Sequence, residues 1–511
     1  MTSVLTFNDD TLAESLANSY TTPDVIKSKN HFSYFKYYLG PNGICAQTIV
    51  LEDQYISRDY LHDYASYYSL CFEPYPKFCR RIHFFSSSFT TEEFEKALTE
   101  SSEEFWKHYL GFVVVKPIPV NAIGYTVLKT YEAGKDMSGR YFWGLKTYTV
   151  HLFGREIKIE SLAFQEQDRV LAACATTSIW SMLNKVTGDT HPEYRAPSQI
   201  TNDADKISPD GSRLFPNKGL NVLQICQAIL SSGLVSEVKQ PDLKNTQVGQ
   251  RVFSGSLLKQ ILRAYSGIGI PIILVIQVPT LNGYRSHAIT VSGFRQECPG
   301  SGPPSKNSSW VADNIATIYA HDDQWGPFTR IKFLEDGIET KWTESHAKSD
   351  PTYVIAAVVS LFPKIRISYE DIKAIVFGLD VILRLLLKDF ANENLSWDVR
   401  ILYSEAFKTE ITNSTLDASD KLRLLTSSMP RYLWVASFYI GANRIMDFSF
   451  DATNIADAMI GLHATCYVNE LKPVVSKFIK DNRAHFIKAF RHKLAERYID
   501  DFLIKQLDAP E

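Results

Sequence analysis

A cysteine stands at the start of a run of small and apolar residues, in the stretch Gln165–Leu183 (QEQDRVLAACATTSIWSML). The run predicts a buried helix over residues 174–185 that begins at Cys174. A thiol in this position meets the free N–H groups and the positive end of the helix dipole, which lower the thiol pKa. Because the thiolate is the nucleophilic form of cysteine, the surrounding fold is expected to supply Cys174 with a base and a substrate.

The chain offers a candidate for each further requirement of thiol catalysis. Such catalysis needs a base near the thiol, a group that orients the base, and donors for an oxyanion. His287 begins the apolar, strand-like run HAITVSGF, and Asp322 or Asp323 ends the next one, ATIYAHDD. Gln167 precedes the cysteine closely enough to place its amide beside the Cys174 N–H. We expect these residues to form one site.

Three motifs carry these residues. A glutamine stands seven residues before a cysteine and its small-residue helix (QDRVLAACATTS), and a histidine precedes an apolar strand that ends in Gly-Phe (SHAITVSGF). The third motif is a strand that ends in acids and is followed by Trp-Gly (IYAHDDQWG). In order, spacing and context the motifs resemble the papain-like cysteine peptidases, most closely the bacterial branch of the double-glycine-leader peptidases. The resemblance covers roughly residues 160–335, about a third of the chain.

The resemblance implies a fold and a set of roles. The cysteine-bearing helix would pack on an antiparallel sheet, with Cys174 as the nucleophile and His287 as the base. The matching register makes Asp323 the acid that orients His287, with Asp322 as the alternative one residue away. Gln167 would help to hold the oxyanion.

Some positions extend or depart from the family pattern. Trp325 matches the indole that shields the bond between the acid and the histidine. Ala175 replaces the usual glycine after the cysteine, and the gap from Gln167 to Cys174 is one residue longer than in papain. The loop between the histidine and the acid is enlarged by CPGSGPPSKNSS, which reads as an exposed insertion. The first two departures leave the oxyanion geometry open.

Plainer interpretations stand beside these roles. A cysteine on an apolar helix is usually a small core residue, and His287 alone would be a structural histidine. The triplet 321–323 (HDD) could bind a metal or cap a turn, but no second cluster at metal-ligand spacing accompanies it. Gln165 and Gln167 could both be solvated. We predict no metal and no cofactor.

The whole chain is expected to be α+β, in three regions. Residues 1–155 form an α+β region of unknown role, residues 156–362 the papain-like domain, and residues 363–511 a mainly helical region. Helical patterns cover residues 87–111 and 397–409, and strand patterns cover residues 431–450.

The composition bears on which classes of partner the chain could bind. The net charge is −3, from 54 basic and 57 acidic residues, which favours neither a nucleic-acid nor an anionic membrane surface. The longest apolar runs, 267–278 and 353–363, are shorter than the roughly 20 residues that span a bilayer. Seven widely spaced cysteines and a polar start (MTSVLTFNDD) predict free thiols in the cytoplasm.

Two classes of function are compatible with the sequence. The first is a hydrolase that cleaves a peptide or amide bond through Cys174, His287 and the acid, with a transglutaminase-like acyl transfer as a variant. The second is an inactive papain-like scaffold that binds protein. The large flanking regions suggest a regulatory protein partner, or an effector role in a bacterial conflict or defence system. The loops at 198–219 and 296–312 carry no readable specificity.

Overall fold

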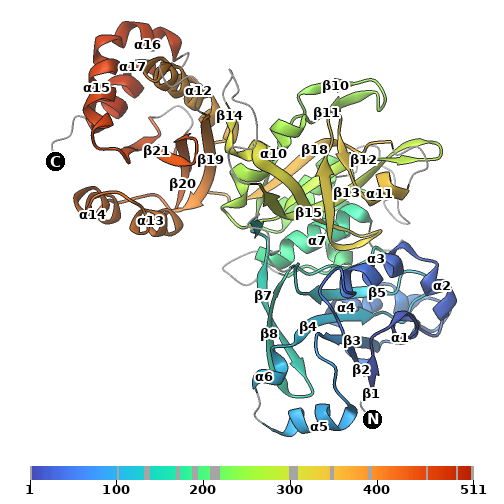
Figure 1. Ribbon diagram of the computed structural model, residues 1–511. Coiled ribbons are helices and arrows are strands. Elements are labelled where there is room, and N and C mark those ends of the chain that lie inside the picture. The colour runs from blue at the N-terminus through green and yellow to red at the C-terminus, as the bar shows by residue number, and fades with distance from the viewer. Residues whose placement is uncertain are drawn as a thin grey trace. The chain divides into compact units, whose positions relative to one another are not determined.

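The computed structural model describes residues 3–100, 103–131, 139–168, 173–186, 194–207, 219–297, 309–345, 350–388, 394–455, 459–490 and 493–507. These residues form an α+β fold in two compact units (Figure 1). Unit 1 comprises residues 1–255, 270–295 and 317–361, and unit 2 comprises residues 256–269, 296–316 and 362–511. The predicted regions 1–155 and 156–362 thus fall largely in unit 1. Most of the predicted insertion, residues 298–308, lies outside the described residues.

Unit 1 begins with a five-stranded antiparallel sheet that the sequence analysis identified only in part. Its order is β1 (Ser3–Thr6), β2 (Thr48–Tyr55), β3 (Cys79–Phe85), β4 (Tyr109–Val115) and β5 (Ile123–Leu128). The helices of this part are α1 (Asp9–Leu16), α2 (Pro23–Lys27), α3 (Asn30–Leu39), α4 (Arg58–Ser66), α5 (Thr91–Thr99) and α6 (Glu103–Trp106).

The helix predicted over residues 87–111 is wrong at both ends. Helix α5 begins after Thr90, whose hydroxyl accepts from the Glu93 N–H while the Glu93 carboxylate accepts from the Thr90 N–H. The helix ends at Thr99, and the chain enters strand β4 at Tyr109. Tyr109 and Leu110 are buried strand residues that continue the β-branched run FVVV.

The second sheet of unit 1 has eight strands and carries the candidate site. Its order is β17 (Ile338–Glu339), β16 (Gly326–Phe333), β15 (Ile315–Asp322), β13 (Gly283–Gln296), β12 (Ile272–Thr280), β18 (Tyr353–Leu361) and β9 (Val235–Lys239), and β6 (Arg140–Phe142) also pairs with β13. Strands β12 and β13 form the predicted hairpin, in which Gly283 adopts a φ of 106° that favours glycine. This confirms the antiparallel sheet expected around residues 270–322.

Helix α7 (Cys174–Val186) packs against this sheet. The Thr290 hydroxyl of β13 donates to the Ser178 carbonyl of α7 at 2.9 Å. One hydrophobic core also joins the two sheets of unit 1, since Phe84 and Val113 belong to the same buried cluster as Tyr319. The remaining elements of unit 1 are η1 (Tyr68–Leu70), β7 (Lys146–Leu152), β8 (Arg155–Ser161), α8 (Pro197–Ala204), α9 (Val222–Ser231), β10 (Leu243–Asn245), β11 (Gln250–Val252) and α11 (Lys341–Ser345).

Unit 2 is built on a sheet of order β14 (Ser309–Trp310), β19 (Leu395–Tyr403), β20 (Tyr432–Ile440), β21 (Asn443–Asp451) and β22 (Gly461–Cys466). The two strands predicted within residues 431–450 are confirmed. The helix predicted from Trp397 is wrong, because residues up to Tyr403 form β19 and helix α13 (Ser404–Thr412) begins only afterwards. The other elements are α10 (Gly255–Ser266), η2 (Val311–Asn314), α12 (Tyr369–Leu386), α14 (Ala418–Thr426), α15 (Leu471–Asp481), α16 (Arg483–Ala489), α17 (Ala495–Arg497), η4 (Tyr498–Ile504) and α18 (Lys505–Leu507).

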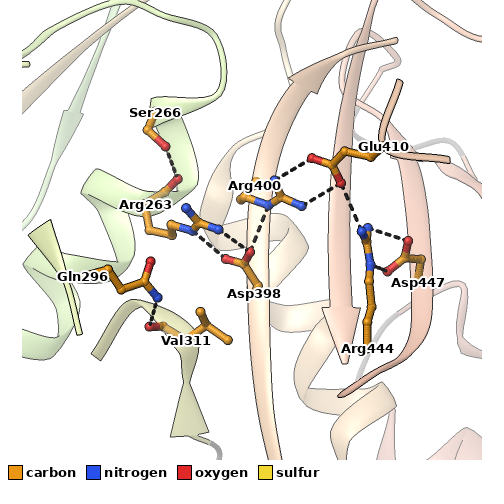
Figure 2. Close-up of polar contacts among 9 residues, drawn as sticks. All are labelled: Arg263, Ser266, Gln296, Val311, Asp398, Arg400, Glu410, Arg444 and Asp447. Carbon is orange, nitrogen blue, oxygen red and sulfur yellow. Dashed lines mark hydrogen bonds and ion pairs between the residues drawn. The ribbon is translucent and has the colours of Figure 1, made fainter. Parts of the chain in front are cut away.

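A ladder of alternating charges crosses unit 2 (Figure 2). Arg263 of α10 donates to both carboxylate oxygens of Asp398, which also pairs with Arg400 at 2.9 Å. We call the six ion-paired residues the charge ladder, and they are Arg263, Asp398, Arg400, Glu410, Arg444 and Asp447. Each member has a partner of opposite sign.

Two observations concern the predicted environment. In the part of the chain that the structure describes, the helices all fall short of the length and apolar character that crossing a membrane requires. The six cysteines within the described residues are free thiols, and Cys298 lies outside them.

Candidate active site

Helix α7 begins at Cys174, as the sequence predicts. Every residue from Ala175 to Leu183 is buried, whereas Cys174 itself is partly exposed. The apolar body of the helix therefore anchors the segment, and its first turn presents the thiol. At this end the free N–H groups of the helix and its dipole favour a negative charge on sulfur.

His287 lies on β13 and is buried, with 7% of its surface exposed. Its Nε2 atom hydrogen-bonds to Oδ1 of Asp322 at 2.9 Å, and Oδ1 of Asp323 lies 3.5 Å away. With Nε2 engaged by the acid, Nδ1 is the ring nitrogen left for a second partner. The Cys174 side chain is a hydrogen-bonding neighbour of this imidazole. The structure thus brings together the predicted thiol, base and acids.

The electrostatics favour a charged imidazole. Burial by itself would lower the pKa of His287, but the Asp322 carboxylate and the Cys174 thiol together raise this pKa well above its usual value. An imidazolium beside the sulfur stabilises a thiolate.

Asp322, the one-residue alternative, makes the hydrogen bond to His287 in place of Asp323. The pairing of β15 with β16 shifts register between Ala320 and Asp322, which marks a β-bulge. An irregularity of this kind changes which of two successive side chains faces a given side of the sheet. The family motif therefore assigns the role of the acid to Asp323, whereas the hydrogen bond to His287 is made by Asp322.

Asp323 occupies the second position beside the imidazole. Its Oδ2 accepts a hydrogen bond from the Gln324 side chain at 3.2 Å, and its backbone carbonyl accepts one from Nε2 of His31 at 2.8 Å. Burial, reinforced by the nearby Asp322 carboxylate, raises the pKa of Asp323 to about 6 even though His287 opposes this. The two acids therefore share one imidazole unequally.

Trp342 of α11 is a site residue that the sequence analysis missed. Its indole N–H donates to Oδ2 of Asp322 at 2.9 Å, and its ring stands edge-on to the His287 ring with centroids 5.4 Å apart. Trp325, which the resemblance assigned to shielding, packs against Trp342 at a centroid distance of 6.1 Å. Trp342 lies in a five-residue helix with no motif around it, so no sequence signal marked it.

The segment before the nucleophile is tied to the first sheet of unit 1. Asn121 donates to the Gln167 carbonyl at 2.7 Å and to the Glu166 carboxylate at 3.0 Å. The same carboxylate lies 3.7 Å from Nδ1 of His31. Gln167 is partly exposed and lines the pocket that contains Cys174, whereas Gln165 is buried. Of the two glutamines, Gln167 is the one placed to face a substrate.

Three residues of the site are of the types that can bind a metal ion. Potential ligand atoms of His287, Asp322 and Asp323 lie within 4.8 Å of one another. Two of these atoms are engaged by neighbouring side chains, since Nε2 of His287 bonds to Oδ1 of Asp322 and Oδ2 of Asp322 accepts from the Trp342 indole. His321, part of the predicted HDD triplet, donates to the Leu162 carbonyl at 3.0 Å, and burial lowers its pKa to about 4. This histidine is therefore a neutral structural residue.

A pocket of about 370 Å³ opens over the thiol and the imidazole. Besides Cys174, His287 and Gln167, its lining consists of Val278, Arg285, Ser286, Gln324 and Trp342. The lining is mostly polar and includes one arginine. A substrate carbonyl in this pocket would meet both the sulfur and the ring that can exchange protons with it.

Comparison with known proteins gives no assignment for this chain. No protein-family model matches the sequence, and no curated protein matches it.

Proposed function

We propose that the protein is a papain-like thiol hydrolase that cleaves a peptide or amide bond. The observation that carries the proposal is the chain of contacts from Cys174 through His287 to the buried Asp322. A thiol at a helix N-terminus, a base with a raised pKa and a pocket over both match the needs of nucleophilic catalysis. As the acid of the proposed triad we assign Asp322, with Asp323 as a second carboxylate beside it.

The proposed reaction has two halves. The Cys174 thiolate attacks the substrate carbonyl carbon, and collapse of the tetrahedral intermediate breaks the C–N bond while His287 gives its proton to the leaving amine. A water molecule then attacks the thioester, and His287 accepts its proton. The C–S bond breaks, and the proton on His287 restores the imidazolium–thiolate pair. An amine in place of this water would give acyl transfer with the same residues.

Two groups are proposed to hold the oxyanion. The Cys174 backbone N–H belongs to the first turn of α7, where helix N–H groups have no intrahelical acceptor. The Gln167 amide lines the same pocket. Donors aimed at the developing charge contribute about 100- to 1,000-fold to the rate in enzymes of this kind. Gln167→Ala is therefore expected to lower kcat by this factor.

Thiol reactivity tests the proposal without a known substrate. At pH 6 iodoacetamide should alkylate Cys174 about 100-fold faster than an ordinary thiol, which is only slightly ionised at that pH. Mass spectrometry of the tryptic peptides would give the rate for each of the seven cysteines. His287→Ala should slow the alkylation of Cys174 to the rate of the other cysteines. Cys226→Ala, which removes a partly exposed cysteine on α9, is the matched control.

A peptide-library assay completes the test. Cys174→Ala should abolish cleavage and leave the urea midpoint of unfolding unchanged, because the side chain is partly exposed. Uniformly slow alkylation of all cysteines, or cleavage that survives in Cys174→Ala, would refute the hydrolase and favour a binding scaffold.

A further inference from the structure

The pocket over the proposed catalytic pair contains one positively charged side chain that the proposed mechanism does not use. Arg285 lies on β13 and lines the pocket beside Cys174 and His287. Its side chain is exposed, and it has no ion-pair or hydrogen-bond partner among the residues that the structure describes. By contrast, the charged members of the ladder in unit 2 all have partners.

Strand geometry places Arg285 on the same face as the base. Side chains two residues apart on a strand point to the same side and lie about 7 Å apart, so Arg285 and His287 both face the pocket. Val278 pairs with Arg285 across the hairpin and also lines the pocket. Ser286 also lines the pocket and accepts a hydrogen bond from the Gln277 amide, whereas the Tyr284 hydroxyl donates to the Pro351 carbonyl.

The charges around the pocket suit an anion. Among the described residues that line it, none is an aspartate or a glutamate. Asp322 and Asp323 lie behind the imidazole and are buried. An anionic group in the pocket would thus meet the Arg285 guanidinium, and the His287 ring would lie between this anion and the two aspartates. A guanidinium with a free planar fork binds a carboxylate through two parallel hydrogen bonds.

We propose that Arg285 selects substrates with a carboxylate close to the bond that is cleaved. This carboxylate could be an Asp or Glu side chain or the C-terminus of the substrate, and both offer the same planar oxygen pair. The inference rests on the proposed function, since it names the substrate class of that site. Arg285 acts in it as a specificity residue and takes no part in proton transfer.

The first test compares two alkylating reagents that differ only in charge. Iodoacetate carries a carboxylate and iodoacetamide a neutral amide, so the ratio of their rates at Cys174 reports anion recognition. Arg285→Gln should lower the iodoacetate-to-iodoacetamide ratio on the order of five-fold, the effect of one unit charge about 7 Å away at the protein surface. Arg285→Lys should keep most of the ratio. Lys244→Gln, which removes an exposed positive charge on β10, should leave the ratio unchanged.

The second test distinguishes the two sources of the carboxylate by protection of Cys174 against iodoacetamide. The probes are acetyl-Ala-Glu-Ala-amide, acetyl-Ala-Ala-Ala with a free C-terminus, and acetyl-Ala-Gln-Ala-amide. Protection by the first indicates an acidic side chain and by the second a terminal carboxylate, and either should be lost in Arg285→Gln. Equal protection by the neutral peptide, or no protection by any of them at millimolar concentration, overturns the proposal.

The two proposals fail in different ways. If iodoacetamide alkylates Cys174 fast but the reagent ratio is the same in Arg285→Gln as in the parent protein, the hydrolase stands and the carboxylate preference is wrong. If neither reagent alkylates Cys174 faster than the other cysteines, the hydrolase is wrong, and the carboxylate preference falls with it.

Discussion

The two units of this protein differ in how completely their charged side chains are paired. In the charge ladder of unit 2 three arginines alternate with three carboxylates, and each has an oppositely charged neighbour (Figure 2). Burial would raise the pKa of Asp398, but Arg263 and Arg400 lower it to about 2. Such a group stays ionised at every physiological pH and has no proton to exchange.

In the candidate site of unit 1, by comparison, acidic groups outnumber basic ones. Two aspartates and a thiol surround one imidazole, and the pKa values of both His287 and Asp323 are raised. Groups with perturbed pKa values beside a pocket are typical of catalytic centres, whereas a fully paired network is typical of a scaffold. The comparison teaches that the candidate site differs from the charge ladder in how completely its charges are paired, more than in how deeply they are buried. Four predictions test it, from the largest effect to the smallest.

Asp398→Ala should destabilise unit 2 by about 4 kcal/mol, because it leaves the Arg263 and Arg400 guanidinium groups without their buried partner. Urea unfolding followed by tryptophan fluorescence would measure the loss. Asp481→Ala, at the exposed end of α15, is the control and should change little. Cys174 alkylation should be unaffected by either change. A loss below about 1 kcal/mol for Asp398→Ala would show that the ladder is not a structural network.

Asp323→Asn should change the pH dependence of stability. The folded pKa of about 6 lies above the usual value, so the contribution of Asp323 is fully present below pH 4 and is lost as the pH rises through 6. Across this window the parent protein should lose about 3 kcal/mol relative to the asparagine variant. Urea midpoints at pH 4, 5, 6 and 7 would measure the difference. Parallel curves for the two proteins would contradict the shared imidazole.

Asp322→Asn and Asp323→Asn should separate the roles of the two acids. Because Asp322 makes the hydrogen bond to His287, its neutral variant should slow alkylation of Cys174 at pH 6 about 100-fold. Asp323→Asn should slow the same alkylation less than about ten-fold, since the Asp323 oxygen lies farther from the His287 ring. The reverse order would restore Asp323 to the role that the family register gives it.

Trp342→Phe should have a smaller effect than Asp322→Asn, a fall in Cys174 reactivity of about ten-fold. The phenyl ring keeps the edge-on contact with His287, but the N–H donor to Asp322 is lost. Trp310→Phe, a buried indole of unit 2, is the control. An unchanged rate in Trp342→Phe would show that the indole serves packing alone.

The sequence carries the parts of the site that depend on local pattern. The start of α7 follows from a change of composition at Cys174, and the hairpin that delivers His287 follows from Asn282-Gly283. The choice of Asp322 follows from the bulge after Ala320, which arises when β15 and β16 pair and leaves no mark in either strand alone. The contact with Trp342 is likewise made by the tertiary fold.

Strand β19 shows why the fold of unit 2 was harder to predict. Its sequence, LSWDVRILY, places Asp398 and Arg400 two residues apart, which is the strand period, and the helical part of the predicted segment 397–409 lies in the α13 residues that follow. In the structure Asp398 is buried, Arg400 is partly buried, and the two are paired within the ladder. Their partners lie on α10 and α13, so the pattern becomes intelligible only once the sheet has assembled.

The contacts of Asn121 and His31 have a practical consequence for dissecting the protein. These residues belong to the first third of the chain, yet they hold the backbone of the candidate site at two places, at Gln167 and at Asp323. A recombinant fragment that starts near residue 156 would leave the main-chain oxygens of Gln167 and Asp323 and the Glu166 carboxylate without these donors. A cut after residue 361 would likewise separate Arg263 of α10 from Asp398, so the whole chain is the sound choice for crystallisation.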